Sequence, residues 1–238
     1  THLGVVKKGP NTTDFDMFDT QTNGQLSRAL NAEQFNARYG SFVEVLAPNQ
    51  LSYNRVLVVG LGDEALSRAQ LTRLGGNIAG QLNSARVSDV SVAAESFDAN
   101  QISLLAHGIN LRAYDFDKYK KEKHQDKSYT FDVVDATAAR TAYTRLENIQ
   151  SGVFLARDLT NEVPTELTPV DFVKEAKKLE AHGVEVKVLG PDKIKALGMN
   201  ALEAVGRGSI DGSRLIVAHY KGNDSAPIAI AGKGITFD

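Results

Sequence analysis

The sequence contains no cysteine among its 238 residues. This absence excludes disulfide frameworks, thiolate zinc sites and cysteine nucleophiles. No apolar run approaches the roughly 20 residues that a membrane helix needs, and the first residues lack a signal-peptide pattern. The formal net charge is only −2, so no overall field attracts nucleic acid or an anionic membrane. We therefore expect a cytoplasmic protein with neither a membrane nor a nucleic acid as its partner.

Before about residue 140, short apolar segments alternate with amphipathic ones. The apolar patterns predict strands and helices in alternation: strands at 41–47, 55–60 and 87–93, and helices at 69–85 and 102–114. Residues 55–60 are apolar enough to be buried on both faces of a sheet. Strands separated by helices indicate an α/β fold with a mixed or parallel sheet.

A long helix is predicted to lead into the second half of the chain. One apolar stripe continues from residue 137 to about 159, and Pro164 then disfavours further helix. A second helix is expected to begin at Thr168, a good N-cap residue that precedes Pro169, and to end at Gly183. Strands are predicted at 184–189, 214–220 and 228–231. These patterns divide the chain into residues 1–136, a linking segment 137–163, and residues 164–238.

The most informative segment lies at the end of the sequence. Gly232-Lys233-Gly234 follows the apolar strand predicted at 228–231, where a cation is unfavourable unless it meets an anion or a metal. Asp238, five residues after Lys233, offers the hard oxygen ligand that divalent cations prefer. On spacing alone, a tight turn with a solvated lysine, followed by a surface carboxylate, explains these residues better than a metal site does.

Residues 232–238 (Gly-Lys-Gly-Ile-Thr-Phe-Asp) resemble the first signature of the leucyl, or cytosol, aminopeptidase family. Three further segments resemble the same family and follow its order: residues 114–120 (Tyr-Asp-Phe-Asp-Lys-Tyr-Lys), residues 156–164 with Leu-Thr-Pro at 167–169, and residues 197–202 with Val-Gly-Arg-Gly-Ser at 205–209. Together these segments span roughly half of the chain, which makes the resemblance specific.

The resemblance implies a metalloaminopeptidase that releases N-terminal amino acids, preferably leucine, from peptides with a free N-terminus. In that family a hydroxide bridging two divalent metal ions attacks the scissile carbonyl. The metals are expected to be manganese or zinc, with magnesium or cobalt as alternatives. The amine of Lys233 and the carboxylate of Asp238 are the implied metal ligands.

The resemblance also implies a macro-like N-terminal domain without catalytic residues, joined by the long helix to the first part of an α/β catalytic domain. No catalytic residue is expected within this segment, because the family's catalytic residues follow the position of Asp238. We therefore expect the 238 residues to belong to a longer polypeptide and to be inactive alone. The family forms homohexamers, which makes a homohexamer the expected assembly.

The alternative is a macro-like module that binds a nucleotide or a partner without catalysis. Its support is Gly60-Leu61-Gly62-Asp63, which follows a predicted strand but lacks the third glycine of a dinucleotide fingerprint. A loop after a core strand explains these residues more simply. The lysine-rich residues 118–127 are mixed with acidic residues and indicate a solvated hairpin or loop. Asp115 and Asp117 are interpreted as surface carboxylates, and Arg207 as a capping or loop residue. The five histidines show no zinc-helix spacing.

Overall fold

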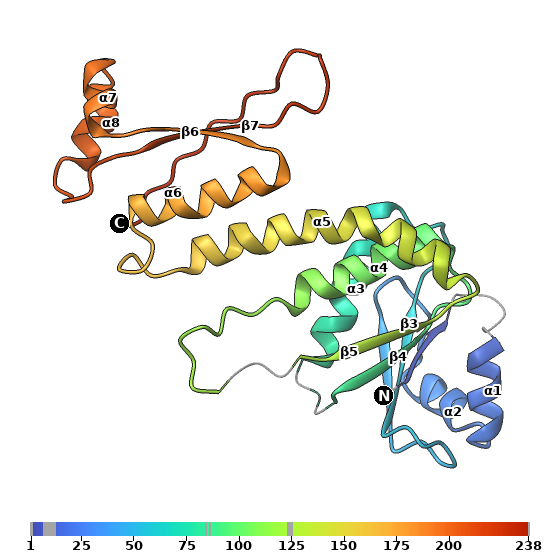
Figure 1. The fold of residues 1–238 in the computed structure, drawn as a ribbon. Helices are drawn as coiled ribbons and strands as arrows, with labels where there is room; N and C mark the ends of the chain where they lie inside the picture. Colours follow the sequence, from blue (N-terminus) through green and yellow to red (C-terminus); the bar gives the residue numbers. More distant parts are fainter. Residues whose placement is uncertain (1, 7–12, 84, 86, 123–125, 238) are drawn as a thin grey trace. The chain divides into compact units, whose positions relative to one another are not determined.

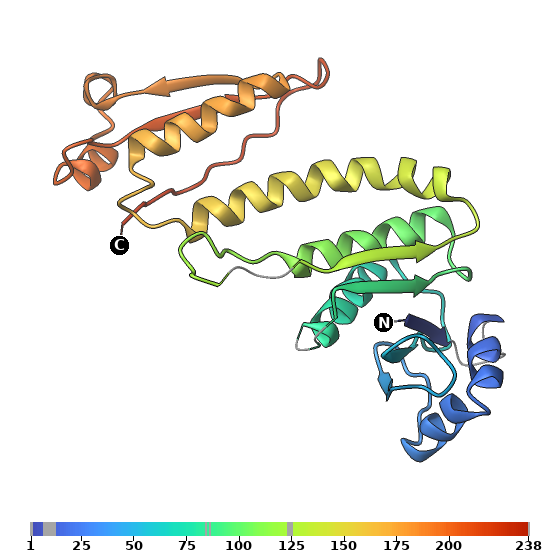
Figure 2. The same cartoon turned by 60° about the horizontal axis from the view of Figure 1, so that its bottom comes forward.

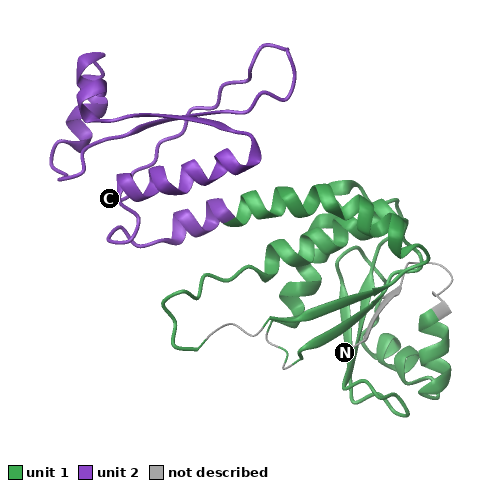
Figure 3. Cartoon of the chain, viewed as in Figure 1, with its two compact units in different colours: residues 1–154 green, residues 155–238 purple. Residues whose placement is uncertain are grey.

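The computed structural model describes residues 2–6, 13–83, 85, 87–122 and 126–237. The chain divides into two compact units, residues 1–154 and 155–238 (Figure 3). Each unit has its own sheet: five strands in the first and two in the second (Figure 1). The α/β fold expected from the sequence is confirmed.

The sheet of the first unit is mostly parallel. Its strands are β1 (His2–Val6), β2 (Phe42–Leu46), β3 (Arg55–Gly60), β4 (Asp89–Ala93) and β5 (Ser128–Asp132). The spatial order is β2-β3-β1-β4-β5, in which only β2 runs antiparallel to its neighbour. The strand predictions at 41–47, 55–60 and 87–93 are confirmed within one or two residues, whereas β1 and β5 were not predicted.

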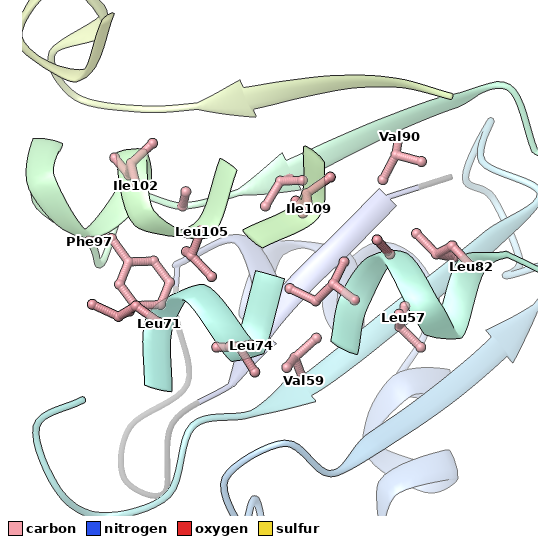
Figure 4. Packing of buried hydrophobic residues seen from close by; sticks show 14 of the residues in the cluster. Leu57, Val59, Leu71, Leu74, Leu82, Val90, Phe97, Ile102, Leu105 and Ile109 are labelled. Carbon is pink, nitrogen blue, oxygen red and sulfur yellow. The ribbon is translucent and has the colours of Figure 1, made fainter. Parts of the chain in front are cut away.

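Helices cover both faces of this sheet: α1 (Thr13–Gln21), α2 (Gln25–Ala32), α3 (Arg68–Leu82) and α4 (Ala99–Ala113). The strand β3 is buried on both faces because its side chains alternate. Val56 and Val58 pack in a cluster with α1 and α2. Leu57 and Val59 pack in a larger cluster with α3 and α4, which Figure 4 shows. The sequence reasoning did not predict α1 and α2, which are only nine and eight residues long.

Helices α3 and α4 cross at unusually close range. A Cβ atom added at Gly75 would meet the carbonyl of Leu105, and one added at Gly108 would meet the carbonyl of Thr72. Both helices begin with a complete capping box, built on Ser67 and Asp98 respectively. Glycine at these two positions therefore lets the backbones approach, and the apolar side chains around the crossing fill the layer above the sheet.

The second unit is entered through α5 (Ala136–Asn161), a 26-residue helix that confirms the long helix predicted from residue 137. The remaining elements are α6 (Pro169–Lys177), the 3₁₀ helix η1 (Lys178–His182), β6 (Glu185–Leu189), α7 (Pro191–Ala196), α8 (Asn200–Gly206) and β7 (Leu215–His219). The strands β6 and β7 pair antiparallel as a two-stranded sheet. Figure 2 gives a second view of these elements.

This second unit buries little of its apolar surface. Among its described residues, only Leu167 and Ile194 are buried hydrophobic side chains. A two-stranded sheet is marginally stable without a hydrophobic layer on its faces.

Of the helices in the part of the chain that the structure describes, none is long and apolar enough to cross a membrane.

The strand predicted at 228–231 is wrong for the described structure, in which these residues form no ladder. Ile228 and Ile230 are each 92% exposed. A strand requires a neighbour for its backbone hydrogen bonds, and in the described residues β7 pairs only with β6. The apolar pattern was recognised correctly, but a pattern cannot supply the missing partner strand.

The α3–α4 crossing leads to a stability prediction. Replacing Gly108 by alanine should destabilise the first unit by about 3 kcal/mol, because the new methyl group meets a backbone carbonyl that cannot move alone. The control is Gly152→Ala on α5, where an added Cβ meets nothing within 4 Å, and which should stabilise by up to about 1 kcal/mol. Urea denaturation followed by circular dichroism measures both, and equal midpoints would contradict the prediction.

Candidate functional site

The segment that carries Lys233 is irregular and exposed. Residues 226–237 belong to no helix or strand, and the side chain of Lys233 lies at the surface. Asp238 lies outside the described residues, so its relation to Lys233 stays a prediction. Among the described residues, no group of three or more histidine, cysteine, aspartate or glutamate side chains could hold a metal ion. The described chain therefore does not by itself assemble a metal site.

Space is open around the two glycines that frame Lys233. A Cβ atom added at Gly232 or at Gly234 would meet nothing within 4 Å. Neither glycine is required by packing in the described structure, in contrast to Gly75 and Gly108. Ile228 and Ile230, which precede Gly232, are exposed, although folded proteins usually bury side chains of this kind. This segment therefore has the composition of a core strand and glycine-flanked loop, without the neighbours that such a strand packs against.

The glycines of residues 60–63 do not form a phosphate cradle. The backbone N–H of Gly60 donates to the carbonyl of Ser41, and that of Gly62 donates to the carbonyl of Ala37, each at 2.8 Å. Gly62 has a φ of 75°, which favours glycine. Because both N–H groups are already used, they cannot cradle a phosphate. The geometry agrees with a loop after a core strand and gives no support to a nucleotide site here.

The segment at residues 167–169 is a helix start. The side chain of Thr168 and the carboxylate of Asp171 exchange hydrogen bonds with each other's backbone N–H group, which makes a capping box, and Pro169 occupies the first turn. Lys174 Nζ also donates to Asp171 Oδ1 at 2.7 Å. The hydrogen bonds from Lys174 and then from Thr168 hold the pKa of Asp171 at about 2. The role of Thr168 and Asp171 in the structure is therefore to cap the start of α6. At the other end of this segment, η1 ends at Gly183, where the sequence predicted the helix to end.

The segments at 197–202 and 205–209 form a junction between short helices. Gly198, with a φ of 67°, ends α7 and allows Met199 to begin α8. A Cβ added at Gly206 would collide with the backbone and side chain of Ser213, whose hydroxyl donates to the carbonyl of Leu202 at 2.7 Å. Arg207 caps α8 and pairs with Glu203 at 2.7 Å, which confirms its predicted capping role.

The segment at residues 114–120 is a loop held by local contacts. Tyr114 lies at the end of α4, and its ring packs against that of Phe154 with centroids 5.2 Å apart. Asp115 pairs with Lys120 at 3.0 Å, as expected of a surface carboxylate. Residues 123–125, which include His124, lie outside the described part of the predicted solvated loop. These contacts are structural, and they bring no second acid to Asp115 for acid–base chemistry.

Sequence reasoning missed a polar cluster within the first unit. His107 on α4 is only 7% exposed, whereas His182 and His219 are exposed. Asn110, one helical turn after His107, donates from its Nδ2 to the hydroxyl of Tyr143 on α5 at 2.8 Å. The spacing of His107 and Asn110 along one helix face was the available signal, but the facing residues come from a helix that begins more than 20 positions later.

Comparison with known proteins decides which family this architecture represents. Residues 3–123 match the N-terminal domain of the cytosol aminopeptidase family, and residues 154–238 match its catalytic domain. The chain belongs to the cytosol aminopeptidase family. Family membership and the resemblance of the four sequence segments agree.

Two bacterial relatives are each about twice the length of this chain. The chain is 39% identical over 230 residues to a probable cytosol aminopeptidase 1 from Shewanella oneidensis, covering 95% of this chain and 46% of that protein. It is 38% identical over 225 residues to a probable cytosol aminopeptidase from a Bradyrhizobium species, covering 90% and 45%. The chain therefore spans a little under half the length of these relatives.

Solved structures support the fold of this cytosol aminopeptidase chain. A tomato leucine aminopeptidase mutant has a TM-score of 0.73 at 22% identity, covering 90% of this chain and 47% of that chain. The bottromycin maturation enzyme BotP in complex with Mn has a TM-score of 0.66 at 21% identity, covering 90% and 44%. At such low identity these likenesses establish the fold alone.

The capping box gives a testable pH dependence. Because the pKa of Asp171 is lowered from 3.8 to about 2, its carboxylate stabilises the folded unit fully above about pH 4, and this contribution is lost as the pH falls toward 2. Thr168→Val should raise the pKa of Asp171 without fully restoring it, because Lys174 remains. Loss of the cap should also destabilise the helix by about 1 kcal/mol.

NMR titration of the Asp171 carboxyl carbon measures the shift. The control is Thr165→Val, the same chemical change at an exposed position outside the capping box. An unchanged Asp171 pKa in Thr168→Val would contradict the contribution assigned to the threonine.

Proposed function

We propose that this chain is the N-terminal half of a metal-dependent aminopeptidase that removes N-terminal residues, preferably leucine, from peptides. The observation that carries the proposal is the match to both domains of one aminopeptidase family, in order along the chain. Residues 232–238, which lie within the matched catalytic domain, contain the amine and carboxylate that the resemblance implies as metal ligands.

Lys233 and Asp238 are proposed to bind two divalent cations together with ligands from the portion of the relatives that this chain does not cover. The donor types fit, because a carboxylate and a neutral amine both bind borderline divalent metals such as zinc and manganese. Such cations polarise a scissile carbonyl and activate water. The structure of BotP in complex with Mn is consistent with manganese as one of these metals.

The role proposed for Lys233 places a chemical demand on it. Lysine binds a metal only through its neutral amine, so binding must displace a proton from Lys233. Its flanking glycines carry no Cβ and leave open space, which allows a cation and its other ligands to approach the backbone closely. Lys233 therefore contributes one ligand, and the proposed site is completed by ligands from the portion of the relatives that this chain does not cover.

The exposed apolar surface of the second unit supports the view that more of a catalytic domain packs there in the whole protein. Neither β6 nor β7 has a buried residue, and Phe237 is 79% exposed. Burial of such side chains is worth roughly 1.5–3 kcal/mol each. A homohexamer remains a prediction that rests on the family resemblance, and a cytoplasmic location remains a prediction that rests on the composition of the sequence.

The test uses the full-length natural polypeptide, whose intact mass should exceed the 25.7 kDa of these residues. Lys233→Ala should lower both bound metal, measured by elemental mass spectrometry, and the hydrolysis of a leucyl-anilide, by at least about 100-fold for turnover. The matched control is Lys221→Ala, which removes an exposed lysine that pairs with Asp224.

The control should keep normal metal content and turnover. Asp238→Asn should behave like Lys233→Ala, because the amide loses the negative charge that holds the cation. If Lys233→Ala retains both metal and turnover, Lys233 is not a ligand. If the unaltered protein binds metal but hydrolyses no aminoacyl substrate, the proposed activity is wrong.

A further inference from the structure

A polar cluster joins α4 to the first half of α5 within the first unit. Asn110 Nδ2 donates to the hydroxyl of Tyr143 at 2.8 Å, and that hydroxyl donates to Gln150 Oε1 at 3.0 Å. His107 lies one turn before Asn110, and Gln150 is its interaction partner on α5. The two helices run side by side in both views (Figures 1 and 2). These hydrogen bonds attach α5 to α4, and α4 itself packs in the core of the first unit.

The attachment of α5 differs in kind from that of α3. Helix α3 meets α4 through glycines and a fully apolar layer, with six buried residues of its own. Helix α5 has no buried residue, and only Ala139 and Leu146 pack from it against the large core cluster. The hydrogen bonds of the polar cluster and the Tyr114–Phe154 ring contact therefore carry much of the attachment of α5.

His107 is the histidine of this cluster and interacts with Gln150. Its ring is buried, and its Nδ1 atom has no hydrogen-bond partner. Burial lowers the pKa of His107 below its ordinary value of 6.5, and the Gln150 side chain opposes this to a smaller extent. The neutral ring is accordingly the form that fits the site, because a proton on Nδ1 would add a buried charge with no acceptor.

The other titratable groups around the cluster do not replace His107 in this role. On α5, Glu147 pairs with Arg140 at 2.9 Å at the surface, and both act on Tyr143. Burial is the main reason that the pKa of Tyr143 is raised, as it is for Tyr129 of β5, which packs against the same core. Arg112 of α4 lies toward α3, beside Gly76 and Gly80. Tyrosines with raised pKa values and arginines keep their charge state between pH 5 and 8.

We propose that His107 makes the attachment of α5 to the first unit sensitive to pH, so that protonation of its imidazole releases α5 from α4 under mildly acidic conditions. The attached state binds fewer protons than the released state, in which His107 is solvated. Attachment is therefore strongest above about pH 6.5 and weakens as the pH falls below it. Since α5 leads into the second unit, acidification loosens the helix through which the two units are connected.

Hydrogen exchange of the 238-residue chain tests this at pH 7.5 and 5.5, after correction for the intrinsic exchange rates. Protection of residues 136–154 should fall by up to about tenfold in the unaltered chain, the limit for one proton linked to opening. His107→Gln should abolish this pH dependence, because the amide is similar in size and does not titrate. His182→Gln, the same change at an exposed histidine, should leave it intact.

Two further measurements keep the proposal open to refutation. Glu147→Gln distinguishes it from acid loss of the Arg140–Glu147 pair, and this variant should retain the full pH dependence. NMR titration of the His107 ring in the unaltered chain does not rely on any variant folding. A His107 pKa at or above 6.5, or a pH dependence that survives in His107→Gln, would overturn the proposal. None of these measurements depends on aminopeptidase activity.

Discussion

The burial of β3 on both faces is the constraint on which the first unit depends. Four successive residues of this strand, 56 to 59, are each 0% exposed. A strand can be buried in this way only if a helical layer covers each face, and the chain supplies α1 with α2 on one side and α3 with α4 on the other. The close α3–α4 crossing then follows, because two helices must fit over one narrow set of strands.

The second unit, in contrast, has no strand that is buried on both faces in the described residues. Its strands have one helix, α6, that makes contacts with both of them, and no buried side chain of their own. Its helices and turns are stabilised by local interactions instead: a capping box at Thr168, glycines with positive φ at 183 and 198, and short-range ion pairs. Local devices fix where elements begin and end, but they do not create a hydrophobic core. This explains how a unit can have well-formed helices and yet expose much of its apolar surface.

The sequence predicted those features that depend on neighbours along the chain. The strand at β3, the helices α3 to α6 and the cap at Thr168 all leave a periodic or positional signature. The strand β1 and the helices α1 and α2 were missed, and all three are short, with five, nine and eight residues. The error at residues 228–231 has another cause, since alternation predicts a capacity for pairing and not the presence of a partner.

The residues of the candidate sites also differ in whether a local sequence pattern reveals them. Lys233 and Asp238 could be singled out only because residues 232–238 resemble a family signature, since the described residues contain no group of three or more histidine, cysteine, aspartate or glutamate side chains that would mark a metal site. The cluster of His107, Asn110, Tyr143 and Gln150 escaped sequence reasoning because its members are separated by up to 43 positions and meet only when α5 lies along α4. Residues that depend on long-range contacts leave no local pattern to read.

The contact between Gly206 and Ser213 also bears on how this part of the chain can vary during evolution. It closes the intervening turn at its base, whereas the tip is fully open, with Ile210 at 103% exposure. A substitution at Ile210 extends into solvent and moves neither end of the turn. The glycine at the base has no such freedom, since any side chain there would push apart α8 and the start of β7.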